Sequence, residues 1–171
     1  MNFSVRLFLG YFLLVGLTGW FYLRSFVAEL TPGMRQSIEE VLVDMAHLLA
    51  EQVAAELAAG RIGDGEFAAG IERFKQRRFQ AAIRQLNKQE PNLVVYITDA
   101  AGRVVFDSRG RDLGQDYSRW NDVYLTLRGQ YGARSTREEA EDPLSSVMYV
   151  GAPILDPAGH LLGVVSLGKP S

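Results

Sequence analysis

Arginine and aromatic side chains alternate through residues 114–135 (GQDYSRWNDVYLTLRGQYGARS), near the middle of the chain. A guanidinium group binds a carboxylate through two parallel hydrogen bonds, and apolar walls strengthen such a pair by excluding water. The mixture therefore predicts a pocket for a small acidic molecule, with Arg119 and Trp120 as the main candidates. The supporting candidates, from the same segment and from flanking strands, are Tyr96, Tyr131, Arg134 and Tyr149.

The same segment also has a purely structural interpretation. Trp120, Tyr124 and Leu127 share one face of a helix that we expect over residues 118–128, with Ser118 as its N-cap. On this interpretation the three side chains pack the helix on a sheet, and Arg119 pairs with a nearby aspartate. The sequence leaves both interpretations open.

Other chemistry has less support in the sequence. The chain has no cysteine, and its two histidines, His47 and His160, have no partners at metal-ligand or catalytic spacing. Asp99 and Asp156 are explained as turn formers, and the acidic residues 138–142 lack the glycine-shaped geometry of a calcium loop. No G-x-S-x-G or H-E-x-x-H motif occurs. We therefore predict no catalytic residue, metal site or cofactor in this chain, and keep a membrane-anchored hydrolase as an alternative.

The first 28 residues predict a membrane helix. Residues 7–23 (LFLGYFLLVGLTGWFYL) carry no charge and, at about 1.5 Å per residue, cover most of a hydrocarbon core about 30 Å thick. Residues 24–28 complete the span. A cleaved signal peptide is less favoured, because no A-x-A site follows. Arginines lie on both sides, so charge does not fix the orientation. The net charge of −2 does not favour nucleic acid as a partner.

Two helices are predicted within residues 29–90. The first extends from Pro32 to about residue 59 after a short break or kink at Thr31-Pro32-Gly33, and the second covers about residues 66–87. Five apolar residues of the first helix have coiled-coil spacing, so this helix either packs only on its own domain or also pairs with a second copy in a homodimer. We call these five residues the seam: Met34, Ile38, Val41, Met45 and Leu48.

Residues 91–171 have the pattern of β-hairpins. Strands are expected over residues 93–98, 103–106, 147–155 and 160–167, with turn residues inside each pair. Together with the helices they predict an α+β fold, in which helices pack on an antiparallel sheet of PAS-like or Cache-like type. Residues 29–171 would form one domain. The last strand reaches the end of the chain, so we expect a second membrane helix beyond it.

Several segments resemble the N-terminal sensor region of CreC-type membrane-bound sensor histidine kinases, and the likeness extends over essentially all 171 residues. The most specific segment is 114–136 (GQDYSRWNDVYLTLRGQYGARST). It is supported by LGYFLLV (9–15), SSVMYV (145–150), API (152–154) and GVVSLGKP (163–170). The resemblance implies a periplasmic sensor domain, anchored in a bacterial inner membrane, that signals through membrane helices to a cytoplasmic kinase core absent from this chain.

The resemblance also implies partners and cofactors of the longer protein. A protein-histidine kinase uses ATP and Mg in its kinase core, and a response regulator receives the phosphoryl group. We expect a homodimer in which a ligand shifts the height or rotation of the membrane helices. The resemblance supplies no ligand-binding residues, so it does not identify the small molecule. The arginines of residues 114–135 favour an anion. An input domain of a chemoreceptor or cyclase would share this topology and remains an alternative.

Overall fold

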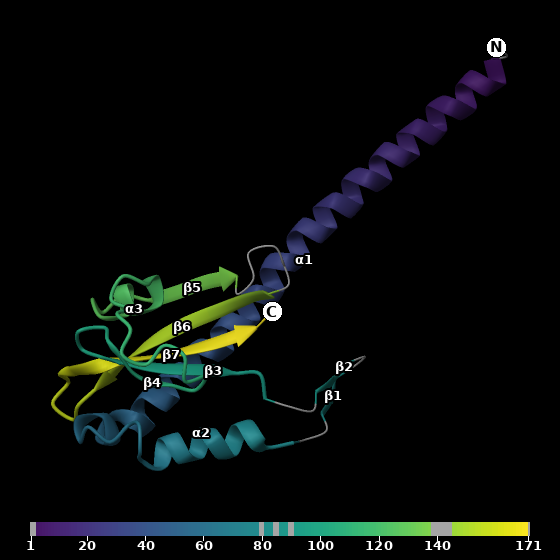
Figure 1. The fold of residues 1–171 in the computed structure, drawn as a ribbon. Coiled ribbons are helices and arrows are strands. Elements are labelled where there is room, and N and C mark those ends of the chain that lie inside the picture. The colour runs from purple at the N-terminus through teal and green to yellow at the C-terminus, as the bar shows by residue number, and fades with distance from the viewer. Residues whose placement is uncertain (1–2, 79–80, 84–85, 89–90, 138–144, 171) are drawn as a thin grey trace. The chain divides into compact units, whose positions relative to one another are not determined.

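The computed structural model describes residues 3–78, 81–83, 86–88, 91–137 and 145–170, without the side chains of residues 26–35, 81–83 and 86–88 (Figure 1). The chain divides into two compact units, Met1–Glu40 and Val41–Ser171. The elements in chain order are α1 (Phe3–Ala58), α2 (Glu66–Gln76), β1 (Ala81–Ile83), β2 (Leu86–Lys88), β3 (Val94–Asp99), β4 (Val104–Asp107), α3 (Asn121–Thr126), β5 (Gly132–Arg137), β6 (Ser146–Leu155) and β7 (Leu161–Pro170).

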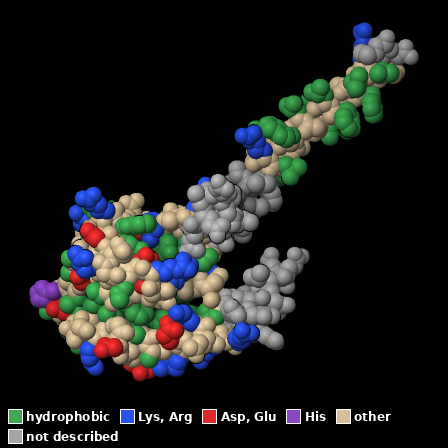
Figure 2. Space-filling view, in the orientation of Figure 1, with side chains coloured by type: hydrophobic (Ala, Val, Ile, Leu, Met, Phe, Trp, Pro, Cys, Tyr) green, Lys and Arg blue, Asp and Glu red, His purple; other side chains and the backbone are tan. Residues whose placement is uncertain are grey.

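The first unit contains the predicted membrane helix. Phe3–Ser25 is long and apolar enough to cross a membrane, and none of it is buried inside the protein. Figure 2 shows hydrophobic side chains along this part of the chain. Such a fully exposed apolar helix fits a lipid environment. The sequence predicted a break or a kink at Thr31-Pro32-Gly33, and the break is wrong, because α1 stays helical through these three residues.

The second unit is built on a five-stranded antiparallel sheet with the order β4-β3-β7-β6-β5. The predicted α+β fold class is confirmed, and β3, β4, β6 and β7 lie where the hairpin pattern placed them. The sequence did not predict β5, an edge strand that pairs with β6 in a register opposing Gly132 to Gly151.

The second predicted helix, residues 66–87, is too long. α2 ends at Gln76, where Arg77 takes an extended backbone conformation with φ −68° and ψ 122°. Residues 81–88 contain the short antiparallel pair β1 and β2 instead. Apolar spacing alone does not locate the end of a helix, so the continued pattern was misleading.

The alternation of side chains along the strands gives the sheet two distinct faces. One face packs against α1 and α2 through Val95, Ile97, Val165 and their neighbours. The opposite face carries Val94 and Tyr96 and packs against Val123 of α3. The helices α1 and α2 therefore cover one face, and α3 with its flanking loops covers the other (Figure 1).

In the second unit, α1 packs on the sheet with a stripe of residues other than the seam. Leu42, Ala46, Ala50 and Val53 are buried in the core. The seam residues Val41, Met45 and Leu48 keep exposed fractions of 57%, 39% and 61%. In the first unit, Ile38 is also exposed, and the Met34 side chain lies outside the described residues. The seam is therefore not used for packing within the second unit.

Candidate functional site

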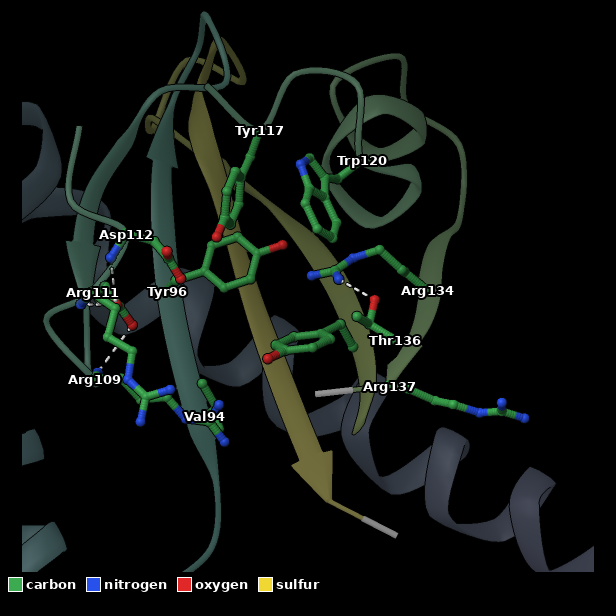
Figure 3. Close-up of a pocket in the computed structure, with 12 residues that line it drawn as sticks. Val94, Tyr96, Arg109, Arg111, Asp112, Tyr117, Trp120, Arg134, Thr136 and Arg137 are labelled. Atoms are coloured by element: carbon green, nitrogen blue, oxygen red, sulfur yellow. Dashed lines mark hydrogen bonds between the residues drawn. The ribbon is translucent and has the colours of Figure 1, made fainter. Parts of the chain in front are cut away.

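A cavity of about 310 Å³ lies on the face of the sheet that carries α3. Its walls come from β3, from the end of β4 and the segment between β4 and α3, and from β5 and β6 (Figure 3). The residues that line it are Val94, Tyr96, Asp107, Arg109, Arg111, Asp112, Tyr117, Trp120, Arg134, Thr136, Arg137 and Tyr149.

The structure brings four of the six predicted ligand-binding residues into this cavity: Tyr96, Trp120, Arg134 and Tyr149. The other two do not line it. Arg119 is exposed although its neighbour Trp120 lines the cavity, and Tyr131 has an exposed fraction of 53%. Arg134 therefore replaces Arg119 as the main candidate for contacting an acidic molecule.

Four aromatic rings form a continuous row along the cavity, which we call the aromatic arc. The row is Trp120, Tyr117, Tyr96 and Tyr149, with distances between successive ring centroids of 5.1, 5.2 and 5.8 Å. Figure 3 shows Tyr96, Tyr117 and Trp120 converging on the same space. Aromatic pairs at these distances attract one another beyond their apolar burial, so the arc is a firm wall.

Arg134 lies between the two ends of the aromatic arc. Its guanidinium carbon is 3.9 Å from the ring centroid of Trp120 and 4.2 Å from that of Tyr149. Its Nε donates a hydrogen bond of 2.9 Å to Oδ1 of Asp122, and its Nη1 donates to Oγ1 of Thr136. Burial is the largest single effect and would lower the pKa of Arg134, but the charge of Asp122, the contribution of Tyr96 and the hydrogen bonds to both together outweigh it, so this pKa is raised. The cavity wall therefore keeps a permanent positive charge.

The carboxylate of Asp122 fixes Arg134 and Tyr96 in place by hydrogen bonds. Its side chain is completely buried and accepts hydrogen bonds from Arg134, from the Tyr96 hydroxyl and, at 2.8 Å, from the Ser166 hydroxyl. Burial, and secondly the charge of Asp122, raise the pKa of Tyr96 well above its ordinary value. Tyr96 therefore stays a neutral donor, and three strands and α3 meet at one carboxylate.

Sequence reasoning did not recognise the role of Asp122. An aspartate in the first turn of a helix is normally an exposed residue that favours the helix dipole, so its position gave no signal for burial. The N-cap prediction for Ser118 was also wrong. α3 starts after Trp120 without a side-chain cap, and the Ser118 amide instead donates to Oδ1 of Asp116 at 2.9 Å.

Two more arginines, Arg109 and Arg111, line the cavity from the loop after β4. The Asp107 carboxylate accepts hydrogen bonds from the backbone amides of Arg109, Arg111 and Asp112 at 3.0, 2.8 and 3.1 Å. These bonds shape the loop so that both arginine side chains line the cavity (Figure 3). Burial, and secondly a hydrogen bond with Asp112, raise the pKa of Tyr117. With four arginines and two aspartates in its lining, the cavity has an excess of positive charge.

The chain thus combines an apolar helix long enough to cross a membrane with an α+β unit that has a charged, aromatic-walled cavity. No family model matches the chain. The chain is 52% identical, over all of its 171 residues, to the sensor protein CreC of Escherichia coli strain K12. The chain is therefore a homologue of part of that protein, and it spans 36% of its length.

Two solved sensor domains are also similar to the chain. The sensor domain of the histidine kinase DctB of V. cholerae has a TM-score of 0.48 and 14% identity, over 85% of this chain and 56% of that one. The sensor domain of DcuS of E. coli has a TM-score of 0.40 and 19% identity, over 76% of this chain and 89% of that one.

The homology to CreC also gives the localisation that the charge pattern did not decide. The chain is an inner-membrane sensor region, and within its described residues Phe3–Ser25 is the one helix that fits a membrane span. Its folded unit lies outside the cytoplasm, as the resemblance implied.

Proposed function

We propose that this chain is the signal-sensing input region of a two-component sensor histidine kinase and that its cavity binds a small anion. Homology to a sensor protein over every residue supports the sensory role. The convergence of Arg109, Arg111 and Arg134 on one aromatic-walled cavity is the observation that carries the ligand class. A guanidinium group pairs with a carboxylate or phosphate more strongly beside an apolar wall than in open water.

The anion would lie between two groups of arginines. Arg134 is fixed by Asp122, and its side chain keeps an exposed fraction of 12%. Arg109 and Arg111 line the cavity from the loop after β4. A ligand that contacts both groups would connect that loop to β5 at opposite edges of the sheet. Binding can therefore favour one arrangement of the sheet and its attached helices over another.

The seam of α1 is the surface through which a change in the arrangement of the sheet and helices would reach a second copy of the chain. Val41, Met45 and Leu48 step by 4 and 3 residues and are exposed, as expected for a helix that pairs in a homodimer. We propose that the longer protein has a cytoplasmic kinase core, which uses ATP and Mg and passes the phosphoryl group to a response regulator. No enzymatic activity or cofactor is proposed for this chain. The homology to CreC favours this function over a chemoreceptor or cyclase input domain, and over an anchored hydrolase.

Titration with simple anions tests the ligand class. The whole chain, in lipid nanodiscs and with Trp20→Phe so that Trp120 is its remaining tryptophan, would be titrated with acetate, benzoate and inorganic phosphate. We expect a saturable change in Trp120 fluorescence with at least one of them. Arg111→Ala should weaken binding about tenfold or more, because it removes one charged hydrogen-bond donor while keeping the backbone amide that Asp107 holds.

Arg119→Ala is the matched control, since Arg119 is an exposed arginine outside the cavity and adjacent to the reporter. This variant should bind as the wild type does. Equal binding by wild type and Arg111→Ala, or a loss confined to Arg119→Ala, would place the anion elsewhere. A lack of any saturable response would remove the anion from the proposed function.

A further inference from the structure

The aromatic arc and Arg134 together form a closed ring. The arc begins at Trp120 and ends at Tyr149, and the guanidinium of Arg134 contacts both of these end rings, at 3.9 and 4.2 Å from their centroids. Tyr96 and Tyr117 connect the ends through ring contacts of 5.1 to 5.8 Å. The guanidinium of Arg134 therefore lies between the two end rings of the aromatic arc, and Tyr96 and Tyr117 continue the wall beside it.

An aromatic surround of this kind is the arrangement that recognises organic cations such as quaternary ammonium groups. Here it also has a buried counter-ion, because the carboxylate of Asp122 lies 2.9 Å from Nε of Arg134 and is completely buried. Aromatic faces and a buried carboxylate are complementary to a cation and not to an anion. The excess of positive charge in the cavity consequently comes from its four arginines, and Arg134 is the one held between the end rings of the aromatic arc.

We propose that Arg134 is a specificity-determining residue, the built-in occupant of an aromatic cation cage. Its guanidinium fills the cage, neutralises Asp122 and excludes organic cations, while the cavity in front of it accepts anions. The anionic half of this inference rests on the proposed function. Removal of the side chain should uncover a site for small organic cations, formed by the aromatic arc and Asp122.

The test compares cation binding before and after the cage is emptied. Whole chains in nanodiscs, all with Trp20→Phe, would carry Arg134→Ala, Arg134→Ala with Asp122→Asn, or Arg128→Ala. The probes are methylguanidinium chloride and tetramethylammonium chloride at millimolar concentration, with ionic strength matched by sodium chloride. Trp120 fluorescence reports on the cage, and the thermal midpoint reports on folding.

We expect no saturable response to either cation in the wild type. Arg134→Ala should respond saturably to both, and methylguanidinium should restore part of its lost thermal midpoint by replacing the missing guanidinium beside Asp122. The double variant removes the buried charge together with its counter-ion, so it should fold better. It should still bind tetramethylammonium, but about tenfold or more weakly, since only the aromatic rings remain.

Arg128→Ala is the control for an ordinary surface contact. Arg128 stacks 3.5 Å above the Tyr124 ring but is exposed and outside the cavity lining. Its removal should create no cation site. The inference is overturned if neither Arg134 variant binds or is stabilised by either cation, or if the wild type or Arg128→Ala binds cations equally well. If Arg134→Ala binds cations but the wild type binds no anion, the inference about the cation cage stands, and the proposal that the cavity binds a small anion is wrong.

Discussion

Replacement of Arg134 by methionine is expected to lower the free energy of unfolding by about 3–5 kcal/mol, because it leaves a buried carboxylate without its cation. Asp122 is completely buried, and its other two partners, the Tyr96 and Ser166 hydroxyls, are neutral. Methionine retains much of the apolar volume, so the loss reports mainly on charge. Urea unfolding of the whole chain in nanodiscs, followed by near-ultraviolet circular dichroism, measures it.

Two further variants separate the buried charge from the arginine itself. Arg128→Met removes an exposed arginine that also stacks on an aromatic ring, and should cost less than about 1 kcal/mol. Arg134→Met combined with Asp122→Asn should cost less than the sum of the two single changes, because the pair is removed together. Strictly additive losses, or an equal loss for Arg128→Met, would contradict the role given to the buried pair.

The second large effect is expected at Gly151, where α3 approaches the sheet most closely. A Cβ at Gly151 would lie 2.2 Å from the backbone oxygen of Asp122 and 2.7 Å from Oγ1 of Thr126. Gly132, its register partner on β5, is equally confined, with both of those oxygens at 2.5 Å. Gly151→Ala should therefore displace α3, cost about 1–3 kcal/mol of stability and weaken anion binding, because α3 carries Asp122.

Gly70→Ala provides the matched control within α2. The nearest atom to a Cβ there is the tip of the flexible Arg73 side chain, at 3.8 Å. Alanine in a helix interior is more favourable than glycine, so this variant should gain up to about 1 kcal/mol. Thermal unfolding of both variants, together with benzoate titration, gives the comparison. A Gly151→Ala chain as stable as the wild type would show that the position of α3 does not depend on Gly151.

The two hairpins could be predicted because their strands combine β-branched residues with recognisable turns. β5 escaped prediction because its sequence, GARSTR, contains small and charged residues with little strand preference. Its pairing with β6 determines that it is a strand. For the same reason the closeness of Arg134 to the aromatic residues could be predicted only in outline, without its distances.

The cavity was only partly predictable. Tyr96, Arg134 and Tyr149 come together because β3, β5 and β6 belong to one sheet, of which the sequence indicated β3 and β6 but not β5. The entry of Arg109 and Arg111 depends on the bonds that Asp107 makes to backbone amides of the following loop, and such bonds have no signature in the spacing of residues. The burial of Asp122 follows from the close contact of α3 with two glycines, which appears only in three dimensions.

Cross-linking of the seam tests most directly the claim that an anion in the cavity changes the pairing of two chains. The chain has no native cysteine, so Met45→Cys and, as a control on another side of α1, the exposed His47→Cys can be compared singly in nanodiscs. We expect faster disulfide formation at Met45→Cys, a change in that rate when acetate, benzoate or phosphate saturates the cavity, and no change when Arg111→Ala is added. Equal rates at the two positions, or a Met45→Cys rate that a bound anion leaves unchanged, would contradict the account.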